Sequence, residues 1–257
     1  MPQHLNIRLK FNHIIQAPML RSLFNKALAQ PCLLCANHQG GKFGVCNDCI
    51  QQLPWFTAPQ CKVCGLVSQH GICGACLSAP PSIDQTQAVF TYDYPLNHLL
   101  QQFKYQEALS ISRLFAHVLQ QKIAQNRTST AVVNGINQPN IDLIIPMPMH
   151  PQRLKTRGFN QAHEIAKPMA KALQLPLNPH VCQRVKLTPP QASLPLKDRV
   201  TNIHGAFECK KNLEGLNIAI IDDVMTTGAS LNELAKTLKK AGAASIECWV
   251  IARTLPR

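Results

Sequence analysis

Residues 216–230 read LNIAIIDDVMTTGAS, and they carry the strongest indication of the fold. The apolar run from Ile218 to Ile221 is typical of a buried strand in a parallel sheet. It ends at two adjacent carboxylates, Asp222 and Asp223, and a helical pattern then runs to about Lys240. The stretch therefore predicts a strand, a loop and a helix in succession, which is the repeating unit of an α/β fold.

The loop of this unit is suited to binding a phosphate group. Its residues are Thr226, Thr227, Gly228, Ala229 and Ser230. A strand–loop–helix junction offers backbone N–H groups, hydroxyls and a helix N-terminus to one phosphate, and Gly228 allows a close backbone approach. A buried strand followed by an ordinary helix cap would explain Thr226 and Ser230. It would not explain the adjacent carboxylates of Asp222 and Asp223, which suit neighbouring sugar hydroxyls.

The same alternation extends over residues 83–257, where short apolar runs alternate with helical patterns and predict a largely parallel sheet. A second strand, from Asp142 to Met147, leads into a loop that contains Arg153 and Arg157. Scattered basic residues usually form a solvated surface. Here they follow a strand end, where α/β proteins bind ligands, so we expect the two guanidinium groups to face an anion.

Eight of the eleven cysteines lie in residues 31–80 as four Cys-x₂-Cys pairs. They are Cys32, Cys35, Cys46, Cys49, Cys61, Cys64, Cys73 and Cys76. Each pair can direct two thiolates at one point, and two pairs complete a tetrahedron around Zn²⁺, so the pattern predicts two zinc ions. Sequential pairing is the simplest arrangement, and crossed pairing also fits the spacing.

The predicted zinc module has two possible roles. A segment of about fifty residues lacks core area and can use metal instead, which is a purely structural role. Alternatively it forms a surface for nucleic acid or a protein partner, with Trp55 and Phe56 stacking on bases. The two aromatic residues by themselves are more often part of a core.

Composition indicates an anionic partner in a reducing compartment. The formal charge of +13 suits nucleic acid or a phosphorylated metabolite, and two zinc–thiolate centres would reduce it to about +9. No secretory signal pattern or transmembrane segment is found, and closely spaced cysteine pairs favour metal binding, so we expect a cytoplasmic protein. No Walker A sequence is present, so the chain should not be a DNA motor by itself.

Three domains are predicted. Residues 1–30 contain no acidic residue and form a basic segment with one short helix. Residues 31–80 form the zinc module, residues 80–82 (Pro-Pro-Ser) a linker, and residues 83–257 the α/β domain.

The stretch IIDDVMTTGAS resembles the motif with which type I phosphoribosyltransferases bind 5-phosphoribosyl-diphosphate (PRPP). The resemblance implies that Asp222 and Asp223 contact the ribose hydroxyls and that residues 226–230 cradle the 5-phosphate. It also implies bound Mg²⁺, and it places Arg153 and Arg157 beside the diphosphate. Residues 185–204 would correspond to a hood over PRPP.

Further stretches resemble the ComF/GntX family, over about residues 31–254. They are Phe103-Lys104-Tyr105, Arg153, Arg157-Gly158-Phe159-Asn160-Gln161, Arg184, Thr188, Gln191, Leu194, Arg199, Asn202 and Gly205-Ala206-Phe207. Members pair an N-terminal double zinc ribbon with a phosphoribosyltransferase-like domain, and some are competence proteins needed for importing transforming DNA. The resemblance therefore implies a role in DNA uptake, with single-stranded DNA and a DNA-translocation helicase or another competence protein as partners.

Catalysis stays open at the level of sequence. Purine-salvage transferases commonly carry an acid in the phosphate loop, and this chain has Thr226 there. Trp249 and Arg253 are the nearest candidates for recognising a base, although Trp249 in an apolar strand is typical of packing. Two alternatives accompany the DNA-uptake hypothesis: an active phosphoribosyltransferase with an unidentified acceptor, and a PRPP-sensing regulator without turnover. No catalytic residue is predicted.

Overall fold

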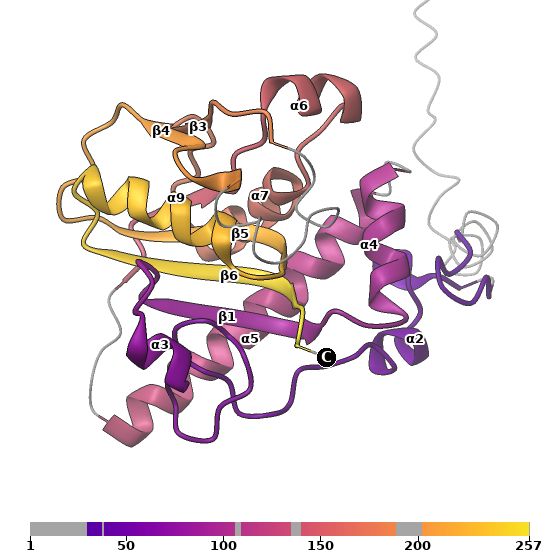
Figure 1. The fold of residues 1–257 in the computed structure, drawn as a ribbon. Helices are drawn as coiled ribbons and strands as arrows, with labels where there is room; N and C mark the ends of the chain where they lie inside the picture. Colours follow the sequence, from indigo (N-terminus) through magenta and orange to yellow (C-terminus); the bar gives the residue numbers. More distant parts are fainter. Residues whose placement is uncertain (1–29, 38, 106–108, 135–139, 189–201, 257) are drawn as a thin grey trace, which may run out of the picture. The chain divides into compact units, whose positions relative to one another are not determined.

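The computed structural model describes residues 30–37, 39–105, 109–134, 140–188 and 202–256 (Figure 1). The predicted helix in residues 1–30 and most of the predicted hood therefore lie outside the described residues. The chain divides into two compact units, Met1–Ile50 and Gln51–Arg257, and each is described by itself. This division falls inside the predicted zinc module, whose boundaries stay a prediction.

The described part of the first unit is a short cysteine-bearing segment. It contains the 3₁₀ turn η1 (Gly41–Phe43) and the helix α2 (Asn47–Gln51), which ends one residue past the unit boundary. Cys32 and Val45 are its buried apolar side chains. Backbone hydrogen bonds from Cys32 to Asn37 and from Leu33 to Gly44 close its turns, at N···O distances of 2.7 and 2.9 Å.

The second unit is built on a four-stranded sheet. Its strands are β1 (Gln85–Thr91), β2 (Leu143–Pro146), β5 (Asn217–Met225) and β6 (Ser245–Arg253). All neighbours are parallel, in the order β1-β6-β5-β2. The predicted parallel sheet is thus confirmed, with residues 218–221 as the buried run at its centre.

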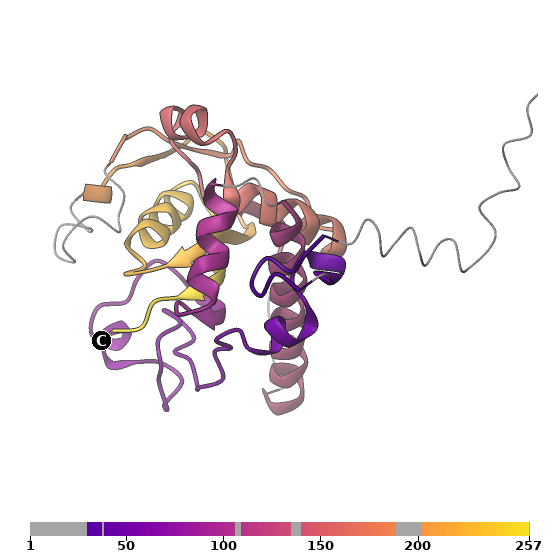
Figure 2. The ribbon, with the colours of Figure 1, turned by 90° about the vertical axis from the view of Figure 1, so that its right-hand side faces the viewer.

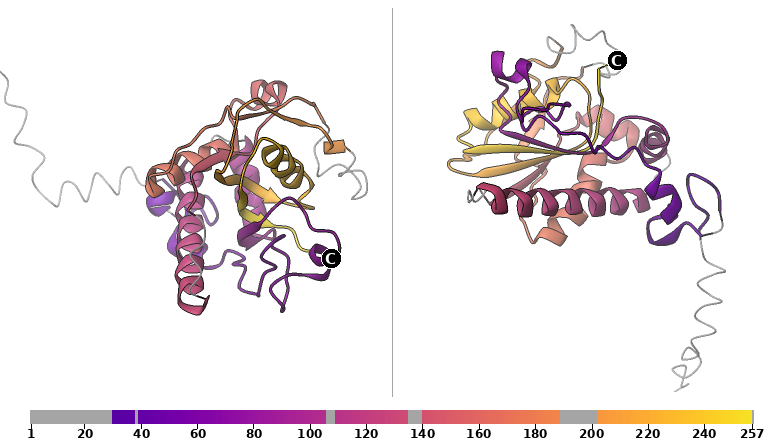
Figure 3. Two further views of the ribbon diagram at one scale, coloured as in Figure 1. Left: turned by 90° about the vertical axis from the view of Figure 1, so that its left-hand side faces the viewer. Right: turned by 90° about the horizontal axis from the view of Figure 1, so that it is seen from below.

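Helices cover both faces of this sheet, which is why its central strands are apolar on both sides. The described helices of this unit are α3 (Gly74–Ser78), α4 (Leu96–Tyr105), α5 (Leu109–Asn134), α6 (Pro151–Arg157), α7 (Gln161–Leu173) and α9 (Ala229–Lys240). Of these, α5, α7 and α9 make the main contacts with the strands of the sheet. The long α5 and the C-terminal α9 lie on opposite sides of the sheet (Figures 2 and 3). Helix α7 packs against α5 and against β2 and β5.

A short antiparallel ribbon stands apart from the sheet. It consists of β3 (Cys182–Arg184) and β4 (Phe207–Cys209), and β4 contacts α9. The ribbon brings Arg184 toward the end of β5 that carries the two carboxylates.

The second group of paired cysteines packs on the sheet of the same unit. Thr86 of β1 donates its backbone N–H to the carbonyl of Lys62 (2.7 Å) and its hydroxyl to that of Val63 (2.6 Å). Gly65 follows with a φ of +68°, and a Cβ placed on it would lie 3.0 Å from Thr86 Cγ2. A side chain would therefore be strained in conformation and crowded against β1.

Candidate functional site

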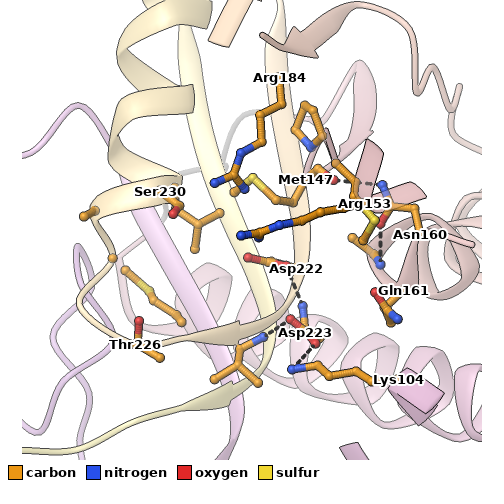
Figure 4. Close-up of a pocket in the computed structure, with 18 of the residues that line it drawn as sticks. Lys104, Met147, Arg153, Asn160, Gln161, Arg184, Asp222, Asp223, Thr226 and Ser230 are labelled. Carbon is orange, nitrogen blue, oxygen red and sulfur yellow. Dashed lines mark hydrogen bonds and ion pairs between the residues drawn. The ribbon is translucent and has the colours of Figure 1, made fainter. Parts of the chain in front are cut away.

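A cavity of about 290 Å³ opens at the carboxyl ends of β2 and β5 (Figure 4). It is lined by every site residue predicted for PRPP except Thr227, namely Asp222, Asp223, Thr226, Gly228, Ala229, Ser230, Arg153 and Arg157. Lys104 from α4 and Arg184 from β3 also line it. The structure thus brings together side chains from four separate stretches of sequence.

The two carboxylates lie in the last part of β5, which continues past the predicted strand end to Met225, and they differ in their surroundings. Lys104 Nζ lies 3.0 Å from Asp223 Oδ2, and Figure 4 shows this ion pair at the side of the cavity. Burial, followed by repulsion from Asp223, raises the pKa of Asp222 well above its usual range. Burial would raise the pKa of Asp223 too, but Lys104 outweighs it and the pKa of Asp223 is lowered. Asp223 is therefore the ionised member, and Asp222 holds a proton more readily.

The loop after β5 turns at a glycine in the left-handed conformation. Gly228 has a φ of +82° and directly precedes α9, so no side chain at that position caps the helix. Thr227 Oγ1 accepts a hydrogen bond from the N–H of Ala229 at 3.3 Å, so Thr227 shapes the loop although it does not line the cavity. The first turn of a twelve-residue helix thus adjoins the cavity and favours an anion.

Guanidinium groups gather on the other side of the cavity. Arg153 donates to the carbonyl of Thr188, and Arg184 donates to the hydroxyl of the same residue at 2.5 Å. The side-chain ends of Arg153 and Arg184 lie beside Asp222 in Figure 4. Burial and then repulsion from Arg157 lower the pKa of Arg153, and burial and then repulsion from Arg153 lower that of Arg184. Four cationic side chains and two carboxylates line the described cavity, so it suits a ligand with several negative charges.

The two predicted arginines lie on the helix α6 and not, as expected, on a loop. Asn160 fixes the short segment between α6 and α7. Its Oδ1 accepts hydrogen bonds from the N–H groups of Ala162 (3.0 Å) and His163 (3.5 Å), which caps α7. Its Nδ2 donates to the carbonyl of Met147 at 3.0 Å, just after β2. The side chain therefore ties the start of α7 to the end of the strand.

Sequence reasoning did not assign Lys104 and Arg184 to the site. Both stood among the residues that resemble the ComF/GntX family, and that was the only signal available for them. Neither follows a strand end of the parallel sheet, so strand-end reasoning could not find them.

The eight paired cysteines form two clusters in sequential order. Cys32, Cys35, Cys46 and Cys49 lie in the first unit, and Cys61, Cys64, Cys73 and Cys76 in the second. Within each cluster the Sγ atoms lie within 4.8 Å of one another.

The geometry of these clusters fits zinc. The Sγ atoms of Cys35 and Cys46 are 3.8 Å apart, and those of Cys64 and Cys73 are 3.6 Å apart. Zn–S bonds of about 2.3 Å in a tetrahedron place sulfur atoms about 3.8 Å from one another. Burial would raise the pKa of Cys61, but backbone N–H groups outweigh it and lower the pKa to about 7, whereas burial raises the pKa of Cys64 and Cys76. Cys61 is therefore a thiolate more readily than these two cysteines. Four cysteines leave no open position, so these are structural sites.

The remaining candidates lie outside the cavity. Trp249 is fully buried and donates to Glu247 Oε2 at 2.9 Å, as expected for a packed tryptophan. Arg253 is 3% exposed and does not line the cavity, so its side chain does not contact a base bound there. Phe56 is buried, whereas Trp55 is 37% exposed with its ring centroid 4.6 Å from that of Phe90. Of the two aromatic residues, only Trp55 offers a surface for stacking.

Comparison with known proteins identifies both parts of the chain. Residues 22–78 match the double zinc ribbon domain, and residues 161–255 match the phosphoribosyl transferase domain. The chain is 34% identical over 230 residues to Competence protein F of Haemophilus influenzae, covering 86% of this chain and 96% of that protein. It is 33% identical over 215 residues to DNA utilization protein YhgH of Salmonella typhimurium, covering 83% and 92%. It is 27% identical over 219 residues to Competence protein ComFC of Bacillus subtilis, covering 82% and 84%.

Within the described residues, none of the helices has both the length and the apolar character needed to cross a bilayer.

Proposed function

Since the chain belongs to the ComF family, in which a double zinc ribbon accompanies a phosphoribosyltransferase domain, we propose that it handles DNA during natural transformation and binds PRPP with Mg²⁺. The names of its relatives, competence protein and DNA utilization protein, support the first part. The second part rests on one observation. Paired carboxylates, a phosphate loop and a group of arginines line a single cavity.

The cavity offers a partner to each part of PRPP. The loop of residues 226–230 would take the 5-phosphate, and Asp222 and Asp223 the ribose hydroxyls. Arg153 and Arg157 would take the diphosphate, whose charge Mg²⁺ neutralises in part when bound. Because Lys104 already pairs with Asp223, it keeps that carboxylate ionised and ready to accept hydrogen bonds.

The zinc ribbons would be structural, and their clusters persist best in a reducing compartment, which supports a cytoplasmic location. Single-stranded DNA is the proposed macromolecular ligand because the chain carries +13 and exposes Trp55. A DNA-translocation helicase or another competence protein would supply the motor function.

Active transfer to an acceptor is the second candidate, and one observation favours it. Displacement of diphosphate by a nitrogen nucleophile requires a group that handles the proton. Asp222, whose pKa is raised by burial and by repulsion from Asp223, lines the cavity and holds a proton more readily than Asp223 does. A regulator that binds PRPP without turnover needs only the binding residues.

Calorimetric titration of the zinc-loaded protein with PRPP and Mg²⁺ tests the pocket. We expect heat from the native protein and none from an Asp222→Ala/Asp223→Ala variant. Glu208→Gln serves as the control, since Glu208 is an exposed carboxylate on β4. Absence of heat from the native protein would contradict PRPP binding. If the native protein binds PRPP but does not consume it in the presence of nitrogen bases, the result supports the regulator without turnover. Consumption of PRPP would support the transferase.

A further inference from the structure

Arg253 joins the second cysteine cluster to the phosphate loop. It is the last residue of β6 and is 3% exposed. Its Nε donates to the carbonyl of Cys64 at 2.8 Å, and one terminal nitrogen donates to the carbonyls of Met225 (3.0 Å) and Thr226. One guanidinium therefore contacts a cluster residue and the two residues at the junction of β5 with the phosphate loop, and it also donates to the carbonyl of Thr254 at 2.9 Å.

This guanidinium is buried without a carboxylate partner. None of the ion pairs between described residues includes Arg253. The carbonyl of Cys64, which accepts the hydrogen bond from its Nε, belongs to the second cluster, which Cys61, Cys73 and Cys76 complete. Four thiolates around one Zn²⁺ carry a net charge of about −2. The metal-loaded second cluster thus supplies the countercharge that a buried guanidinium requires.

The parts joined by Arg253 are themselves tightly packed. On the cluster side, Gly65 touches β1 so closely that a Cβ would lie 3.0 Å from Thr86 Cγ2. On the loop side, the Met225 side chain lies under Gly228, where a Cβ would come within 2.7 Å of Met225 Cε. A shift of the cluster at Cys64 can therefore be passed by Arg253 to the carbonyls of Met225 and Thr226, and the side chain of Met225 lies beside Gly228.

We propose that Arg253 is a positioning residue through which metal at the second cluster, and not at the first, sets the shape of the phosphate loop. Metal at the second cluster fixes the position of Cys64, whose carbonyl accepts a hydrogen bond from Arg253. Arg253 in turn donates to the carbonyls of Met225 and Thr226 at the start of the loop. Metal at the second cluster thereby raises the affinity for PRPP, and by linkage PRPP slows the loss of that metal. The affinity statement rests on the proposed function, but the coupling of metal to loop shape does not.

Hydrogen–deuterium exchange of residues 225–231 tests the coupling without any ligand. Cys76→Ser removes the fourth cysteine of the second cluster, and Cys49→Ser is the matched change in the first. We expect Cys76→Ser and Arg253→Met to speed amide exchange in the loop on the order of tenfold, within the usual range of coupling between sites. Cys49→Ser should leave loop exchange unchanged, and residues 218–221 should stay protected in every variant, which shows that the sheet is folded.

Metal retention gives a second readout. A chelator should remove one of the two zinc ions faster from Arg253→Met than from the native protein, with the other unaffected. Arg253→Lys keeps the charge but loses the fork of donors, so it should give an intermediate rate. If residues 218–221 do not stay protected in Arg253→Met, loop exchange and metal retention are measured on Arg253→Lys in its place. In PRPP titration, Cys76→Ser should lose about tenfold in affinity and Cys49→Ser none.

Two results would overturn the proposal. The first is equal loop exchange in Cys76→Ser and Cys49→Ser. The second is an Arg253→Met variant with native loop exchange and native metal retention. A native protein that gives no heat with PRPP would contradict the proposed function alone, because loop exchange and metal retention still decide whether the coupling exists.

Discussion

At the scale of single residues, the ion pair of Lys104 and Asp223 separates two carboxyl groups that share one strand end. Lys104 lowers the pKa of Asp223, while burial raises that of Asp222. Attraction to Asp223 in turn raises the pKa of Lys104. Lys104 thus stabilises the charge of Asp223, while Asp222 beside it is protonated more readily, so the repulsion between two full negative charges is reduced.

Replacing Lys104 by Met should destabilise the protein in a pH-dependent way. Because the pKa of Asp223 is lowered by folding, the stability from its charge is present above the pKa of an unfolded aspartate, about 3.9, and is lost as the pH falls further. We expect Lys104→Met to lower the free energy of unfolding by about 1–3 kcal/mol at pH 7, and by less at pH 3, which lies below the pKa of an unfolded aspartate. Denaturant unfolding at the two pH values measures this.

Lys167→Met is the control for that comparison. Lys167 is half-exposed and pairs with Glu164 on the same helix, so its loss should cost about 0.5 kcal/mol or less. Equal losses for Lys104→Met at both pH values would show that the pair with Asp223 does not stabilise the fold.

At the scale of elements, the turn between β5 and α9 depends on Gly228. Gly228→Ala places a side chain at φ +82° and against Met225. We expect a loss of about 1–2 kcal/mol in stability and weaker PRPP binding, measured by thermal unfolding and calorimetric titration. Gly71→Ala is the matched control, because Gly71 has a φ of +79° with no atom near its Cβ position. Native PRPP affinity in Gly228→Ala would speak against a cradle formed by this turn.

Elements also show what could be predicted from sequence. The strand, loop and helix of residues 216–240 were predictable because every signal is local: four apolar residues, two carboxylates and a helix-opening glycine. Lys104 was not assigned, because its ion pair depends on where α4 lies on the sheet. The ribbon of β3 and β4 could not be predicted either, because a strand of three residues is too short to show an alternation of polar and apolar side chains. Cysteine spacing allowed two pairings, and only the folded arrangement of the eight sulfurs distinguishes them.

At the scale of the whole molecule, the charge of +13 and the exposed Trp55 make separable contributions to the proposed DNA binding. Affinity for an oligothymidylate should fall as salt rises, with a log–log slope of about −0.7 per phosphate contact. Trp55→Leu should weaken binding by about 1–3 kcal/mol for each stacked base and leave the salt slope unchanged. Titrations at several salt concentrations measure both. Binding insensitive to salt would contradict phosphate contacts, and a changed slope in Trp55→Leu would contradict stacking.

The strand order β1-β6-β5-β2 has a consequence for the nascent chain. The ribosome makes β1 before any other strand of the sheet and β6 after all of them, yet β6 lies between β1 and β5. Until β6 emerges, β1 has no neighbour in the sheet, and the guanidinium that joins Cys64 to the phosphate loop does not yet exist. The cavity is therefore assembled late in synthesis, after the second cluster has already had time to acquire its metal.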